Sequence, residues 1–387
     1  MEEHLMVSRA KSAFIFLILI CLCVISFWCL SDAIVNNKNA TLTVNIVSFI
    51  FVFYVSIIIH ELTHSLVFIY SKMRIRAFCF FPFCFIHDGT RWNIAISWKY
   101  MGALGASVPE QVAIKNEDDF RKTTKAYSNS MLAATMSGLV MTILGLLILV
   151  IGYCFLKNEN LWILGTMWTF LNFLSLEGAF TRTANAAGDY FAYKYMFSNE
   201  EVSTHLIYDY MKLSVKYNEI RVNSEYLREK LVACFEKKFK EKLVDVDSIV
   251  IATTFINDFL IRRIDLPKQI EKYIEELNDN LQEFDDIKNT EVFKKYITKV
   301  AYYYEFIGNH IRAIKINYDY ITNFSNGPVD KYLKMQAEQI ILKKDNTSYL
   351  LKRENIKPDS YYSYYRLFDG YIEDEIILNQ RINSLQD

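Results

Sequence analysis

The apolar residues of this 387-residue chain are concentrated in its N-terminal half, whereas the C-terminal half is dense in Lys, Glu, Asp, Asn and Tyr. A helix needs about 20 predominantly apolar residues to cross the hydrocarbon core of a bilayer. The segments long enough for this are Phe14–Leu30, Val44–Tyr70, Met131–Leu156 and Leu161–Phe180. The pattern predicts a mostly helical chain, with a polytopic core in the membrane followed by a part exposed to water.

The distribution of Lys and Arg among the loops predicts how these helices are oriented. Segments 31–43 and 157–160 carry one basic residue each, whereas the loop 71–127 carries nine. Because Lys and Arg are enriched in cytoplasmic loops, we expect that loop and both termini in the cytoplasm. No signal-peptide cleavage site follows Phe14–Leu30 cleanly, so we interpret this segment as a retained anchor. The seven cysteines suggest no disulfide framework, and Cys79 and Cys84 are expected to be ordinary thiols.

A cluster of ionisable residues ends the apolar stretch of the second predicted span. Residues 44–59 carry no charge, and His60, Glu61 and His64 follow directly. On a helix the two histidines lie on one face, four residues apart, where both rings can bind a single zinc ion. Glu61 lies at the edge of that face, where it can serve as a general base. Ionisable groups are costly at membrane depth, so we favour a catalytic zinc site over histidines that merely bond to neighbours.

Residues 40–195 resemble the site-2 protease family of intramembrane zinc metalloproteases. The resemblance rests on the His60–His64 motif within a span, on the strand-like alternation of residues 78–98, and on the small residues 133–138 of the third span. It implies a short β-hairpin that pairs with an extended substrate. It also implies a zinc cofactor with a third, carboxylate ligand, which corresponds to Asp189. This chain departs from the family pattern in having Leu139 and Ser175 where prolines are expected, and Gly188-Asp189 in place of Asp-Gly.

The third zinc ligand has alternatives in the sequence. Glu177 is a carboxylate on the preceding span. For Asp189 we favour the ligand role over its alternative as the first polar residue after a span or the N-cap of a helix over residues 190–196. The spacing Arg182-x-x-Asn185-x-x-Gly188-Asp189 is similar to a motif of membrane CAAX-processing endopeptidases, whose ligand would correspond to Asn185. A neutral amide is a poor zinc ligand, which argues against that mapping. His87, in the predicted hairpin, is interpreted as a turn residue or a substrate contact.

The C-terminal half alternates apolar and charged residues at helical spacing, and contains few Gly or Pro. Amphipathic helices are predicted over residues 201–217, 225–242, 266–281 and 291–307. Residues 308–314 are similar to the middle of a tetratricopeptide repeat, which would turn at Gly308. We therefore predict a membrane-embedded domain over 1–197 and an all-helical cytosolic domain over 198–387, built as an array of helical hairpins or as a bundle.

Charge and motif together define the expected function. A net charge of −1 argues against a nucleic-acid partner. We expect a multi-pass zinc metalloprotease of a bacterial cell membrane, since the Lys, Asn, Ile and Tyr content suggests an AT-rich genome. Its substrate would be a membrane-bound peptide or protein, and the C-terminal domain would bind a protein partner. The alternatives are a catalytically silent binding or immunity protein and, less favoured, a transporter, for which the sequence shows no internal repeat.

Overall fold

The computed structural model describes residues 42–96, 105–181, 188–240, 246–262, 266–281, 284, 287–357 and 369–383. The chain divides into two compact units. The first unit comprises Met1–Glu110 and Arg121–Asn199, and the second comprises Gln111–Phe120 and Glu200–Asp387. The predicted span Phe14–Leu30 lies outside the described residues, and the predicted domain division at residue 197 stays a prediction.

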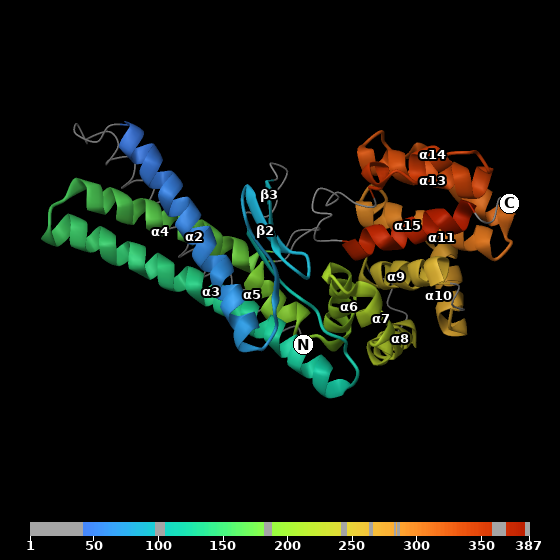
Figure 1. Ribbon diagram of the computed structural model, residues 1–387, viewed down its shortest axis with the longest axis horizontal. Helices are drawn as coiled ribbons and strands as arrows, with labels where there is room; N and C mark the ends of the chain where they lie inside the picture. The colour runs from blue at the N-terminus through green and yellow to red at the C-terminus, as the bar shows by residue number, and fades with distance from the viewer. Residues whose placement is uncertain are drawn as a thin grey trace. The chain divides into compact units, whose positions relative to one another are not determined.

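Three long helices build most of the first unit; in Figure 1 two of them, α3 and α4, run alongside each other, and α2 crosses them at an angle. They are α2 (Leu42–Tyr70), α3 (Glu117–Val150) and α4 (Glu159–Phe180). A π-helical turn, η1 (Ile151–Phe155), continues α3 towards α4, and α5 (Asp189–Phe191) and η2 (Ala192–Met196) follow α4. Helices α3 and α4 approach so closely at Gly145 and Gly165 that a Cβ atom on either glycine would overlap the backbone of the facing helix. Small residues permit this close packing in membrane helices.

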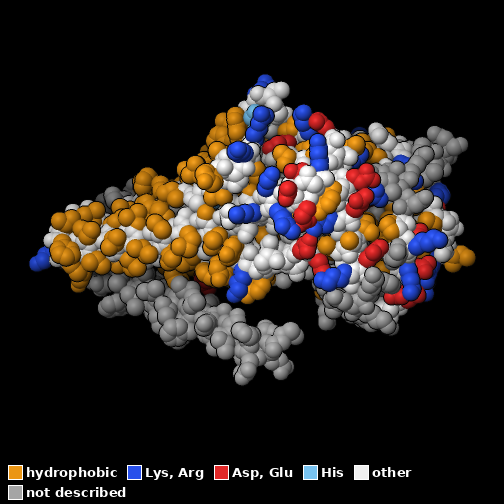
Figure 2. Space-filling model, turned by 90° about the horizontal axis from the view of Figure 1, so that it is seen from below, with side chains coloured by type: hydrophobic (Ala, Val, Ile, Leu, Met, Phe, Trp, Pro, Cys, Tyr) orange, Lys and Arg blue, Asp and Glu red, His pale blue; other side chains and the backbone are white. Residues whose placement is uncertain are grey.

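The outer surface of these helices is apolar. We call α2, α3 and α4 together the helical arm of the first unit. Figure 2 shows hydrophobic side chains covering this arm, with few charged groups among them. Within the described residues, Ile46–Tyr70 and Glu117–Phe155 are long and apolar enough to cross a membrane. The expected span Leu161–Phe180 in α4 is not among them, since that helix carries several hydroxyl, amide and carboxyl side chains. A polytopic core therefore stays a prediction.

A four-stranded antiparallel sheet follows α2, where a short hairpin was predicted. Its strands are β1 (Ile75–Phe80), β2 (Phe83–His87), β3 (Trp92–Ile96) and β4 (Gly105–Pro109), in the order β3-β2-β1-β4. The hairpin prediction covered the first three strands only in part. It missed β4, because the short sequence GASVP has neither alternating polarity nor β-branched residues apart from one valine.

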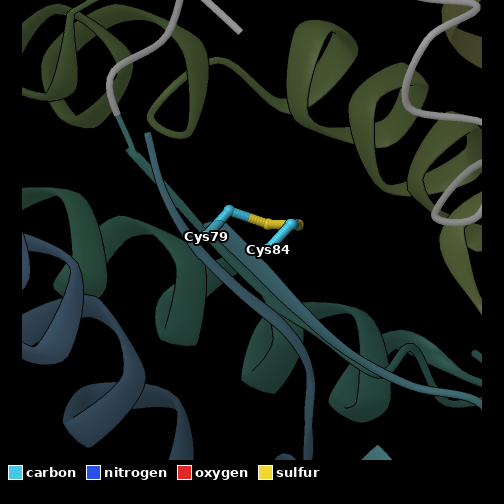
Figure 3. The surroundings of a disulfide bond; sticks show 2 residues. All are labelled: Cys79 and Cys84. Carbon is cyan, nitrogen blue, oxygen red and sulfur yellow. A yellow bond between two sulfur atoms is a disulfide. The ribbon is translucent and has the colours of Figure 1, made fainter. Parts of the chain in front are cut away.

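The prediction that Cys79 and Cys84 are ordinary thiols is wrong in this structure. Antiparallel pairing of β1 and β2 sets the two residues directly opposite each other, with their Cα atoms 4.0 Å apart. A disulfide joins them across the hairpin, as Figure 3 shows. Cytosolic proteins keep their cysteines reduced, so the bonded pair does not support the cytoplasmic side predicted for this loop.

All regular secondary structure in the described residues of the second unit is helical. Its helices and 3-10 turns are α6 (Glu200–Tyr210), η3 (Met211–Leu213), α7 (Tyr217–Val222), α8 (Glu225–Lys240), α9 (Val246–Arg262), α10 (Lys268–Asp279), α11 (Glu291–Phe306), α12 (His310–Asp319), η5 (Ile321–Asn323), α13 (Pro328–Leu342), α14 (Thr347–Leu350), η6 (Arg353–Asn355) and α15 (Asp369–Asn383). One continuous apolar core joins them. The chain turns between α11 and α12 at Gly308, whose φ of 83° suits glycine.

Residues 111–120 pack into this core although they lie between the two sequence segments of the first unit. Ile114 and Phe120 are buried members of the core. The backbone N–H of Gln111 donates to Ser214 Oγ, and that of Ile114 donates to Ser224 Oγ, each at 3.0 Å. These hydrogen bonds satisfy buried backbone groups of an irregular segment, which would otherwise be costly to bury.

Candidate metal centre

Helix α2 presents His60 and His64 on one face, as their four-residue spacing predicts. Asp189, the first residue of α5, lies next to the two rings although it is far from them in the sequence. Its Oδ2 lies 2.9 Å from His60 Nε2 and 3.6 Å from His64 Nε2. The ligand atoms of the three residues all lie within 4.8 Å of one another. No other group of three or more such residues in the described part of the chain has this spacing.

The chemistry and spacing of these atoms fit zinc. Zinc bonds to imidazole nitrogen and carboxylate oxygen at about 2.0–2.2 Å, so neighbouring ligands of a tetrahedral ion lie about 3.3 Å apart. The distances of 2.9 and 3.6 Å bracket that value. Burial would raise the pKa of Asp189, but hydrogen bonds from His60 and His64 outweigh it and hold the pKa below its usual range. Asp189 is therefore a carboxylate at neutral pH, as a metal ligand must be.

Glu61 is buried beside the ligand group and against the sheet. Strand β4 passes so close that a Cβ atom on Gly105 would overlap the Glu61 carboxyl group. A hydrogen bond of 2.7 Å between Ser65 Oγ and Ser107 Oγ links the same strand to α2. Only glycine at position 105 lets the strand pass without displacing the glutamate side chain.

A cavity of about 630 Å³ opens onto these residues. Its polar lining consists mainly of His60, Glu61, His64 and Asp189, and β4 contributes backbone from residues 105–107. Apolar side chains of α2, α3 and α4 complete the wall, among them Phe53, Ile57, Met131, Leu171 and Leu174. The cavity therefore has room for more than one side chain. Part of its wall is apolar, and another part carries the possible metal ligands.

The family model of Peptidase family M50 matches residues 48–337, which is most of the chain and includes the whole ligand group. This chain belongs to Peptidase family M50. The resemblance to site-2 proteases is thus confirmed, and the match extends well beyond the expected residues 40–195 into the second unit. Members of the family are zinc-dependent metallopeptidases of membranes. No curated protein and no solved structure matches the chain.

Among the described residues, the other ligand predicted for this M50 peptidase is not part of the group. Glu177 lies on α4 and does not belong to the ligand cluster. Asn185 lies outside the described residues. Gly188, not Asp189, is the N-cap of α5, and no side chain caps that helix. His87 accepts the backbone N–H of Gly89 at 3.2 Å and packs on Trp92, which agrees with a turn residue.

Two residues that the sequence did not single out also border the centre. Ser130 of α3 contacts the far nitrogen of the His64 ring, and Gly105 of β4 contacts Glu61. Neither belongs to a recognisable motif, and a serine in an apolar helix or a glycine before a short strand is common. The only signal in the sequence was the position of Ser130, a polar residue directly before the apolar run Met131–Leu156.

Proposed function

We propose that this chain is a membrane-embedded zinc metalloendopeptidase that cleaves a membrane-associated peptide or protein near the cytoplasmic face. The observation that carries the proposal is the convergence of His60, His64 and Asp189, with Glu61 beside them in one cavity. The excess of Lys and Arg in the loop 71–127 supports the cytoplasmic side, whereas the Cys79–Cys84 disulfide in the same loop counts against it. An intact Glu61 counts against the silent alternative, since binding alone needs no general base.

In this proposal His60, His64 and Asp189 hold zinc, and Glu61 moves the protons. The ion supplies Lewis-acid activation of water and of the scissile carbonyl. Glu61 takes a proton from the attacking water and delivers it to the leaving amine. Its burial against Gly105 limits the positions that the carboxyl group can take at the edge of the cavity.

The substrate is held as an extended strand. A helix in the membrane keeps its carbonyl groups hydrogen-bonded, so a helical substrate must unwind before attack. Strand β4 ends the described sheet order and lines the cavity, whereas β2 and β3 lie on the other side of β1. We therefore assign strand pairing with the substrate to β4, in place of the predicted hairpin over residues 78–98.

A protein partner of the second unit is a separate part of the proposal. The exposed side chains of Ile311 and Tyr318 on α12 support it, because large apolar groups at helical spacing are typical of binding surfaces.

The test compares three carboxyl-to-amide variants of the full chain in proteoliposomes. Glu61→Gln should retain zinc and lower cleavage of a quenched-fluorescent library of membrane peptides by about 10²–10⁴-fold, because it removes proton transfer. Asp189→Asn should lose both zinc and cleavage, because it removes an anionic ligand. Glu177→Gln is the matched control and should change neither, because this carboxylate lies outside the ligand group.

Zinc content is measured by elemental analysis after dialysis. Unchanged cleavage by Glu61→Gln would contradict the assignment of the base. Full zinc retention by Asp189→Asn would transfer the ligand role to another residue. A wild-type protein that holds zinc but cleaves no library member would favour the silent binding protein.

A further inference from the structure

We propose that Ser130 is a positioning residue of the metal centre, which holds the His64 imidazole with Nε2 free to bind the ion. The inference rests on the proposed zinc site but not on proteolysis. Ser130 lies on α3, and its Oγ is 2.8 Å from His64 Nδ1. The side chain of Ser130 is completely buried, so no solvent molecule can take its place without a rearrangement of α2 and α3.

The two hydrogen-bond partners of Ser130 Oγ favour one tautomer of the His64 ring. The hydroxyl of Ser130 has one proton, and the backbone carbonyl oxygen of His64, a pure acceptor, lies 3.5 Å from Oγ. When the hydroxyl donates to that carbonyl, Oγ accepts a hydrogen bond from Nδ1–H of the ring. The proton that the neutral ring keeps is then on Nδ1, so the ion can replace the Nε2 proton that faces Asp189 in the metal-free protein.

The second histidine lacks such support in the described structure. His60 Nδ1 is buried, and it has no hydrogen-bond partner among the described residues. The two imidazoles, equivalent in the sequence motif, therefore differ in their support: His64 is held at both ring nitrogens, by Ser130 and Asp189, whereas His60 is held at Nε2 by Asp189 and has no partner on Nδ1 among the described residues. A hydrogen-bond partner of the ring nitrogen that does not bind the metal typically raises metal affinity by about 10–100-fold.

A purely structural role for Ser130 makes a different prediction. A hydrogen bond between membrane helices stabilises their packing modestly, whether or not a metal is present. A structural serine would thus affect the unfolding of the metal-free protein and leave zinc affinity alone. A positioning serine would weaken zinc binding and leave the metal-free protein nearly unchanged.

The experiment uses the full chain in detergent and two substitutions at this position. Zinc affinity is measured by competition with a chelator, and metal-free stability by thermal unfolding. Ser130→Ala should bind zinc about 10–100-fold more weakly than wild type. Ser130→Thr keeps the hydroxyl and should bind more tightly than the alanine variant. With Co²⁺ in place of zinc, the visible absorption spectrum should change in Ser130→Ala, because the His64 ring is no longer held in place.

Ser137→Ala is the matched control on the same helix. Its Oγ donates to Ala134 O at 2.8 Å within α3, away from the histidines, so zinc affinity should stay at the wild-type value. The proposal is overturned if Ser130→Ala binds zinc as wild type does, if the alanine and threonine variants are equally weak, or if Ser130→Ala unfolds the metal-free protein. Zinc binding by wild type without proteolysis would overturn the proposed function and leave this inference standing.

Discussion

The helical arm of the first unit and the helices of the second unit distribute their side chains in opposite ways. On α3, Val140 and Leu147 are 58% and 53% exposed, whereas α11 of the second unit buries an almost continuous row from Tyr296 to Tyr304. The buried polar groups differ too. In the arm, the hydroxyls of Thr142 and Thr169 donate to carbonyl groups four residues earlier in the same helix.

The second unit instead satisfies buried charges by contacts between helices. Lys299 Nζ of α11 lies 2.7 Å from Glu375 Oε1 of α15, and Tyr332 and Gln336 of α13 each donate to Glu375 Oε2 at 2.9 Å. The difference agrees with the prediction that the arm contacts lipid and the second unit contacts water. Polar groups in lipid need partners within the protein, which the helix backbone supplies for these threonines, whereas a region in water can bury ions only within a complete network.

The largest expected effect comes from breaking that network. Lys299→Met leaves the carboxylate of Glu375 buried without its cation, which should destabilise the second unit by about 3–5 kcal/mol. Thermal unfolding of the full chain, followed by circular dichroism, measures this. Lys272→Met is the control, because its pair with Glu276 is exposed and contributes about 0–1 kcal/mol. Equal losses in both variants would remove the distinction between buried and exposed ions.

The same network predicts a response to acid. Burial would raise the pKa of Glu375, but attraction to Lys299 and the hydrogen bonds outweigh it and hold the pKa below its usual value of 4.5. Its stabilising contribution is therefore present above that value and is lost as the pH falls through the lowered pKa. Lys299→Met lacks this contribution at every pH, so the difference in unfolding free energy between wild type and variant should shrink as the pH falls below 4.5. A difference that stays the same at every pH would contradict the assignment.

A charge on the exposed face of the arm is the next test of the comparison. Val140→Arg puts a guanidinium in the predicted lipid-facing surface and should cost about 2.5–3.5 kcal/mol of membrane insertion. The readout is the fraction of protein recovered in membranes after alkaline washing. Recovery equal to wild type would argue that this face is not in contact with lipid.

Gly105→Ala should have a comparable effect on activity but none on the second unit. The added methyl group overlaps the Glu61 carboxyl, and a displacement of about 1 Å can lower the rate about 10²-fold. Zinc content should stay unchanged, since the ligands lie elsewhere. Gly138→Ala is the control, because its Cβ would meet only Leu176 at 3.9 Å. Wild-type cleavage by Gly105→Ala would show that the strand tolerates a side chain there.

The smallest effect is expected where the same kind of substitution as Val140→Arg is made in the second unit. Ile311 of α12 is 84% exposed, and Ile311→Arg should change the stability of the protein by less than about 0.5 kcal/mol. Thermal unfolding of the purified protein measures it. A loss as large as that of Val140→Arg would mean that both surfaces have the same solvent, and the comparison would fail.

The sequence by itself determined the features that depend on neighbouring residues. The zinc-binding face of α2, the apolar stretches, the helices of the C-terminal half and the turn at Gly308 all follow from periodicity or from local backbone preference. The geometry of one helix relates residues four positions apart, so His60 and His64 meet in any helical context. The family resemblance added Asp189, whose distance from His60 no local rule provides.

Only the tertiary structure decided the contacts between distant segments. Ser130 is 66 residues from His64, and β4 joins the sheet after a break in the strand pattern. The pairing of Cys79 with Cys84 depends on the register of β1 and β2, and the packing of residues 111–120 depends on a core made by later helices. Such contacts are selected by the packing and hydrogen bonding of the whole chain, which local sequence patterns do not encode.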